Sequence, residues 1–230
     1  SNQSIWEPGK ISNAIRFDGV NDYATVPATL GKNFTVCLWI KTTSNDGNAT
    51  STNWNGPIGL VTGPLDKHAL MLAKGKFRLW SGPSNRCRIS SFSHVNHGSW
   101  IHIAASREDL LHSNGQMRIY INGNLDKKET KGDTDQNTGS VLYLGRTPEG
   151  MEYFDGLMDD LYVFNRRLFG SEVKALYDRG LRGATFENYA FENNTAESNA
   201  TLAFQNSLTA HITFDETNGS QSAMDASGNG

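Results

Sequence analysis

The stretch that decides the fold runs from Leu142 to Gly180, LYLGRTPEGMEYFDGLMDDLYVFNRRLFGSEVKALYDRG. Apolar segments at Val141–Leu144 and Leu157–Phe164 flank a loop that ends in Phe154-Asp155-Gly156. Short runs of β-branched, aromatic and leucine residues bounded by glycine are typical of strands. The following residues, Ser171–Asp178, carry apolar side chains at helical spacing, which predicts one short helix capped by its first serine.

Similar short apolar runs, separated by turn residues, recur along the rest of the chain and predict an all-β sandwich of two antiparallel sheets. Asn122-Gly123 lies between two of these runs and predicts a type I′ hairpin, because both residues tolerate positive φ angles. Ala73–Lys76 predicts a second hairpin in the same way. The expected strands are Ala14–Phe17, Tyr23–Val26, Phe34–Lys41, Ile58–Thr62, Ala69–Ala73, Lys76–Ser81, Arg88–Phe92, Trp100–Arg107, Gln116–Ile121, Asn124–Lys131, Val141–Gly145 and Gly156–Phe164.

Composition limits the classes of partner. The 230 residues fit a single β domain, because sandwiches of about 200–250 residues form one unit. The net charge is −3, and residues of both signs are scattered along the chain, so no basic surface for nucleic acid is expected. No run of about 18 apolar residues exists, so no membrane span is expected. Cys37 lies in an expected strand, which favours a buried thiol, and a disulfide bond to Cys87 is the alternative.

A second motif, NAIRFDGVNDY at Asn13–Tyr23, precedes the Leu142–Gly180 stretch along the chain. Together they resemble the laminin-G-like group of concanavalin A-like jelly rolls. The resemblance implies a jelly-roll sandwich over about residues 9–180. It also implies a non-catalytic binding module of an extracellular protein.

The chain is expected to divide into a jelly roll at 1–182, a polar linker at 183–207 and a tail at 208–230. The tail begins with the apolar run Leu208–Phe214, which resembles the first strand of a laminin-G-like domain. Either this segment completes the same sandwich, or it starts a neighbouring repeat. An open sheet edge promotes aggregation, which favours closure by the tail. We expect a monomer, with exchange of this strand between copies as the alternative.

The resemblance also implies a structural calcium ion at Asp159 and Asp160, which we place at the beginning of the last strand, at the end of the sheet. Calcium prefers six to eight oxygen ligands from carboxylates and carbonyl groups. In related jelly rolls the partner oxygens come from the first strand, which corresponds here to Asp215, Glu216 and Gly219 in the tail. The alternative interpretation is a solvated acidic pair that ends a strand.

Tryptophan and arginine residues are the candidate ligand-binding groups. Trp54 lies in a polar loop, where an aromatic ring is suited to stack on the face of a sugar. A second candidate sits on a predicted sheet face. It comprises Trp80 with Arg78, Arg86 and Arg88. The alternative for both sites is an aromatic residue that anchors a loop.

Catalysis is not expected. Glycosidases of this broad fold carry paired carboxylates on one strand, and no expected strand here has that arrangement. His94 and His97 have a metal-like spacing, but without accompanying ligands they indicate a loop pair.

We therefore expect a non-catalytic extracellular module, secreted or on a cell surface, that binds glycan. The alternatives are protein–protein adhesion, a spacer repeat of a surface protein, or an accessory domain of a secreted polysaccharide-degrading enzyme.

Overall fold

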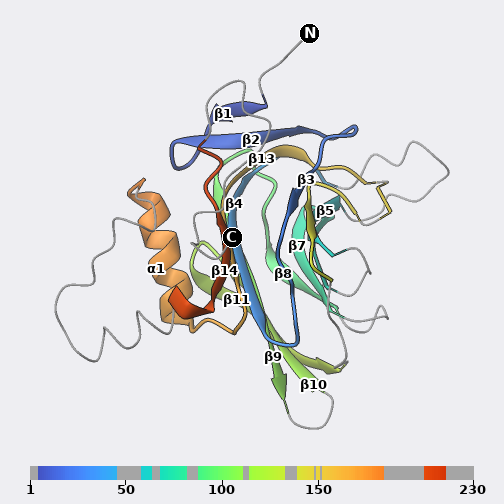
Figure 1. The fold of residues 1–230 in the computed structure, drawn as a ribbon, viewed down its shortest axis with the longest axis vertical. Coiled ribbons are helices and arrows are strands. Elements are labelled where there is room, and N and C mark those ends of the chain that lie inside the picture. Colours follow the sequence, from blue (N-terminus) through green and yellow to red (C-terminus); the bar gives the residue numbers. More distant parts are fainter. Residues whose placement is uncertain are drawn as a thin grey trace.

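The computed structural model shows two β-sheets packed face to face, with one helix against the outer face of the larger sheet (Figure 1). The structure describes residues 5–45, 58–63, 68–81, 88–110, 114–132, 139–147, 149–150, 152–183 and 205–215. This architecture confirms the predicted antiparallel two-sheet sandwich. No helix within these ranges is long and apolar enough to cross a membrane.

The strands follow the predicted segments closely, including one within the tail run Leu208–Phe214, with one additional short strand near the N-terminus. They are β1 (Trp6–Pro8), β2 (Asn13–Asp18), β3 (Ala24–Val26), β4 (Phe34–Lys41), β5 (Ile58–Thr62), β6 (His68–Ala73), β7 (Lys76–Ser81), β8 (Arg88–His94), β9 (Ile101–Leu110), β10 (Asn114–Ile121), β11 (Asn124–Gly132), β12 (Leu142–Leu144), β13 (Asp155–Phe164) and β14 (Leu208–Ile212).

Within the described residues, one sheet has eight strands and the other six. The eight-stranded sheet follows the order β1-β2-β13-β4-β9-β10-β11, and β14 pairs with β13 beside this path. The six-stranded sheet follows the order β3-β12-β5-β6-β7-β8. Strands β13 and β2 come from distant parts of the sequence, so the larger sheet depends on long-range pairing.

Both predicted hairpins are confirmed. Asn122 and Gly123 have φ angles of 50° and 76° in the two-residue turn between β10 and β11. Lys74 and Gly75 have φ angles of 54° and 68° between β6 and β7. Glycine adopts positive φ at low cost and asparagine tolerates it, and the resulting turn twist matches that of the strands.

The helix α1 (Gly170–Leu181) is longer than predicted, and the predicted cap is wrong. Its N-cap residue is Phe169, whose backbone N–H donates to Oε2 of Glu172 at 2.6 Å. A glutamate three residues after the N-cap can accept from a backbone N–H that the helix leaves unpaired. Ser171 therefore lies inside the first turn.

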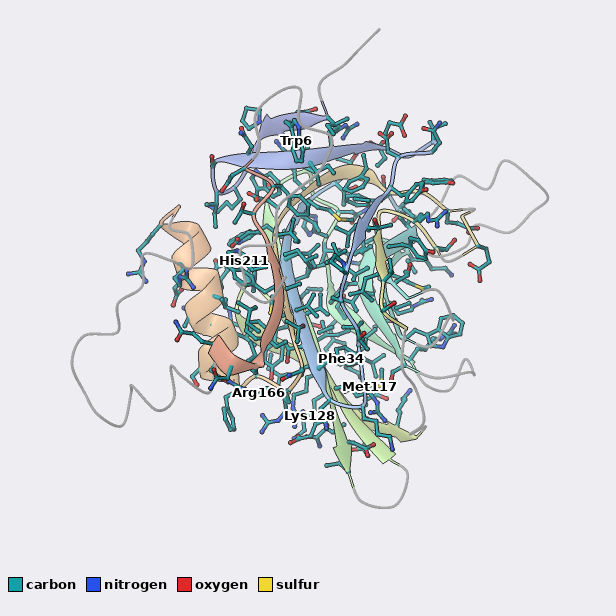
Figure 2. The ribbon with its side chains drawn as sticks, in the orientation of Figure 1. Trp6, Phe34, Met117, Lys128, Arg166 and His211 are labelled. Atoms are coloured by element: carbon teal, nitrogen blue, oxygen red, sulfur yellow. The ribbon has the colours of Figure 1, made fainter. Side chains whose placement is uncertain are left out.

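Two apolar clusters stabilise this arrangement. The larger one fills the space between the sheets and includes Phe34 and Met117, both labelled in Figure 2. The smaller one joins the outer face of the eight-stranded sheet to α1 through residues such as Tyr162 and Leu176. Cys37 lies in this second cluster as a buried free thiol, as favoured from the sequence, whereas Cys87 lies outside the described residues.

Candidate functional site

The predicted acidic pair lies where two strands meet end to end along β13. Strand β2 pairs with Asp155–Met158, and β14 pairs with Leu161–Phe164. The pairing of β13 with β4, on its other side, shifts register between Asp159 and Tyr162. Asp159, the register partner of Trp39, therefore lies at the edge of a bulge in the middle of β13, and Asp160 lies within that bulge. The prediction that they sit at the end of the sheet is wrong, because the strand begins earlier and its two neighbours leave a junction there.

The side chain of Asp159 is fully buried. Its Oδ2 accepts hydrogen bonds from the backbone N–H groups of Lys10 and Ile11, both at 2.8 Å. Within the part of the chain that the structure describes, Oδ1 is buried and has no hydrogen-bond partner. The pKa of Asp159 is raised to about 8, mainly by burial and also by the nearby Asp160 and Asp215, against the opposing effect of the two N–H groups.

The loop that holds Asp159 depends on Gly9. A Cβ atom at this position would lie 2.6 Å from Oδ2 of Asp159 and 2.6 Å from the backbone of Asn13. The loop closes with a hydrogen bond from the N–H of Gly9 to the carbonyl oxygen of Ser12 at 2.9 Å. Only a residue without a side chain allows this approach. The glycine in WEPGKIS was the one sequence signal for this loop, and the sequence analysis missed it.

The tail brings a further carboxylate to the junction. Oδ1 of Asp215 accepts a hydrogen bond from the backbone N–H of Asn13 at 3.1 Å, which joins the end of the tail strand to the beginning of β2. The predicted ligands Glu216 and Gly219 lie outside the described residues. Within the described ranges, no group of three or more His, Cys, Asp or Glu side chains could by itself hold a metal ion.

Asp160 makes a different set of contacts. It has a positive φ of 52°, and its Oδ1 lies 2.7 Å from Nε2 of His211 on β14. The imidazole ring of His211 stacks on Tyr162 with a centroid distance of 4.1 Å (Figure 2 labels His211). Burial, followed by Asp160, raises the pKa of Tyr162 well above its usual value. Asp160 thus ties the tail to β13, a role for which the sequence alone gave no partner.

The described residues of the second predicted ligand site lie together on the outward face of the six-stranded sheet. On β7, Phe77 and Leu79 point into the core, so Arg78 and Trp80 face outward. Arg88 on β8 is the register partner of Trp80. Nε of Arg78 donates to Oγ of Ser90 at 3.1 Å. Trp54 and Arg86 lie outside the described residues.

Other acidic and histidine side chains have structural partners. Asp155 accepts a hydrogen bond from Nη2 of Arg16 at 2.7 Å. Nε2 of His97 lies 3.0 Å from the carbonyl oxygen of His94, as a loop pair would. Glu152 is nearly buried, and its pKa is raised by burial and then by Glu149.

This geometry, an antiparallel sandwich of two sheets with one helix against the outer face of the larger sheet, is that of the jelly-roll class of domains. The family model for the concanavalin A-like lectin/glucanases superfamily, of the laminin G type, matches residues 18–174. The chain belongs to this superfamily, as the resemblance in its motifs implied.

One curated relative and two solved structures illustrate the similarity. Adhesion G-protein coupled receptor V1 of Danio rerio is 26% identical over 161 residues, which are 67% of this chain and 2% of the receptor. This chain therefore corresponds to a small part of the receptor's length.

Among solved structures, a protein from Bacteroides ovatus whose carbohydrate binding is inferred has a TM-score of 0.61 at 16% identity, over 97% of this chain and 58% of that one. Domain 4 of AbnA, an extracellular GH43 arabinanase from Geobacillus stearothermophilus in complex with arabinotriose, has a TM-score of 0.53 at 22% identity. That match covers 77% of this chain and 82% of the other. At such identities the similarity establishes the fold.

Proposed function

We propose that this chain is a non-catalytic extracellular module that binds glycan through the outward face of its six-stranded sheet. The observation that carries the proposal is the position of Trp80, which lies beside Arg88 and two residues from the outward-facing Arg78. An aromatic ring packs against the C–H face of a sugar, and arginine N–H groups donate to its oxygen atoms. The carbohydrate-binding neighbours among solved structures support the same function.

A glycan array with the purified chain tests this proposal. We expect binding to a defined set of oligosaccharides, and loss of most of it in Trp80→Ala. The matched control is Phe169→Ala, which removes an exposed aromatic ring before α1, on the opposite side of the molecule. Equal loss in both variants, or unchanged binding in Trp80→Ala, would contradict the assignment of this sheet face.

We also propose a structural calcium ion at the junction of β2 and β14. Asp159 and Asp215 would hold it, completed by Glu216 and Gly219 of the tail. The unpaired, buried Oδ1 of Asp159 fits this role, and so does the mutual repulsion between the two carboxylates. A divalent cation supplies the positive charge that such a cluster lacks. Because Oδ1 of Asp160 already contacts His211, we give Asp160 the smaller part in the proposed site.

Protein–protein adhesion is the second candidate function, favoured by the similarity to an adhesion receptor. In this case the same array would show no glycan binding, and the partner would be a cell-surface protein. A spacer repeat of a surface protein would bind neither. An accessory role beside a catalytic domain is compatible with the glycan proposal, since the similar arabinanase domain belongs to a larger enzyme.

A further inference from the structure

A cluster of two tyrosines and one arginine lies on the same sheet as Trp80, near the opposite edge of that sheet. The guanidinium carbon of Arg146 lies 4.1 Å from the ring centroid of Tyr23 and 4.1 Å from that of Tyr143. The two rings meet edge to face, with their centroids 6.3 Å apart. Tyr23 is 51% exposed, so part of this aromatic surface faces solvent. A planar cation is thus held between two rings at the surface.

The stacking leaves the hydrogen-bonding edge of Arg146 available. Among the described residues, its guanidinium group makes no hydrogen bond or ion pair, and its Nε is buried without a partner. Cation–π contacts use the face of the guanidinium plane, whereas its N–H groups point outward within the plane. The two Nη groups of Arg146 are not among the buried atoms without a partner, so these are the groups that a ligand oxygen would meet.

Glu152 follows Arg146 in the same loop, but the two side chains form no ion pair among the described residues. Burial raises the pKa of Glu152. The guanidinium fork matches the two oxygen atoms of a carboxylate or a sulfate group, to which it can donate two parallel hydrogen bonds.

Register places this cluster and Trp80 on one line across the sheet. Tyr143 points outward, because Leu142 and Leu144 on either side of it belong to the core. Three strand spacings, about 14 Å, separate Tyr143 on β12 from Trp80 on β7. The side chains between these two rings, Thr62 and Ala69, are small and are themselves buried, with exposed fractions of 0% and 2%. The row of register partners is Thr25, Tyr143, Thr62, Ala69, Trp80 and Arg88.

The same face carries an excess of positive charge. Lys76, Arg78 and Arg88 face outward on β7 and β8, and Arg146 lies at the other end of the row. The net charge of the whole chain is −3, so this concentration of cations does not follow from composition. A ligand that spans the row would meet cationic groups at both ends, with aromatic rings beside them.

We propose that Arg146, held between Tyr23 and Tyr143, is a second recognition site that binds the carboxylate or sulfate group of an acidic oligosaccharide. The proposal rests on the proposed function and names its ligand class. An oligosaccharide long enough to reach both ends of the row also contacts Trp80, so Trp80 contributes to binding of any glycan, whereas Arg146 selects for the acidic group. The two residues then differ in their effect on specificity.

Titration of three oligosaccharides of equal length into the chain tests this site. One is neutral, one contains uronic acid and one carries sulfate esters. We expect Arg146→Gln to lower the affinity for at least one acidic oligosaccharide by about tenfold or more and to leave the neutral one unchanged. Loss confined to the uronic acid or to the sulfated probe identifies which acidic group is recognised. The matched control is Arg182→Gln, which removes the same charge from an exposed position after α1.

Equal weakening in Arg146→Gln and Arg182→Gln would overturn the proposal, because it indicates unspecific charge attraction. Unchanged binding of both acidic probes in Arg146→Gln would overturn it too, while neutral binding lost in Trp80→Ala would still support the proposed function. If Arg146→Gln does not fold, Tyr23→Ala at the exposed ring replaces it and is expected to show the same selective loss. A wild-type chain that binds none of the three probes would overturn both proposals.

Discussion

Nε2 of His211 lies 2.7 Å from Oδ1 of Asp160, in the interior between α1 and the eight-stranded sheet. The two residues are 51 positions apart in the sequence, and both side chains are at least 95% buried. This contact is a buried polar link between the tail strand and the rest of the sandwich. It therefore reports directly on whether the tail is docked.

Removal of this link should destabilise the fold. His211→Ala or Asp160→Ala is expected to lower the free energy of unfolding by about 1–3 kcal/mol, because each leaves a buried polar group without its partner. Urea unfolding of both single variants and the double variant measures the coupling. The control is Lys174→Ala, which breaks an exposed ion pair with Asp178 and should cost about 0.3–0.5 kcal/mol. Strictly additive losses would show that the two side chains do not interact.

Deletion of the tail should have a larger effect. Leu208, Ala210, Ile212 and Phe214 are each at most 3% exposed, and burial of a large apolar side chain contributes about 1.5–3 kcal/mol. A chain that ends at Arg182 is thus expected to melt at a sharply lower temperature or to aggregate through the open edge of β13. Addition of a peptide of residues 205–215 should restore part of the loss. A truncated chain that is soluble, monomeric and equally stable would show that the tail contributes nothing.

The stability of the calcium-free chain should depend on pH through Asp159. Its pKa rises from 3.8 to about 8 on folding, so the native state binds the proton more tightly than the unfolded state. The contribution of proton binding at Asp159 to the free energy of unfolding is fully present below pH 3.8 and is lost as the pH rises toward about 8. With chelator present, the free energy of unfolding should fall over this range by several kcal/mol. Asp159→Asn should remove this slope, and Asp155→Asn, at the exposed start of β13, should keep it.

Bound calcium should oppose this loss of stability at higher pH, because the ion binds the ionised carboxylates. An ion that binds only the native state stabilises it by about 2.7 kcal/mol at a hundredfold excess over its dissociation constant. The melting temperature of the metal-loaded chain should fall with chelator, most strongly above pH 7, where the carboxylates are more often ionised. Asp159→Ala should abolish the response to chelator. An unchanged melting curve, with loading verified beforehand, would exclude this calcium site.

The chain should not hydrolyse glycosidic bonds. The acidic side chains of β13 are engaged with Arg16, with backbone N–H groups or with His211, so no pair of them is presented together to a sugar. A retaining or inverting mechanism requires two carboxyl groups on either side of the scissile bond. Reducing-sugar release from a panel of polysaccharides measures this activity. Release that disappears when one acidic residue is substituted would contradict the prediction.

Local features of the fold could be predicted from the sequence. Asn122, Gly123 and Gly75 favour the positive φ angles of their turns through their own conformational preferences, which do not depend on distant residues. The apolar face of α1 was equally visible, because Val173 and Leu176 recur at helical spacing and are buried. The turns and this helix face agree with the prediction, whereas the helix begins at Gly170 and its N-cap is Phe169 rather than Ser171.

The candidate sites depend on contacts that no local pattern contains. Asp159 looks like the end of a strand until β2 and β14 are placed on either side of the bulge. Tyr23 and Arg146 are far apart in the sequence, and only the pairing of β3 with β12 brings them together. The register of long-range strand pairing is set by the whole core, so a single sequence did not reveal these neighbours.

The end-to-end placement of β2 and β14 along β13 has a consequence for synthesis in the cell. His211 leaves the ribosome 51 residues after Asp160, which corresponds to roughly 3–10 s at ordinary rates of translation. Throughout that interval, half of β13 has a neighbour on only one side, and its backbone N–H and C=O groups can recruit a strand from another nascent chain. Slower translation between these two residues would lengthen this exposure, and faster translation would shorten it.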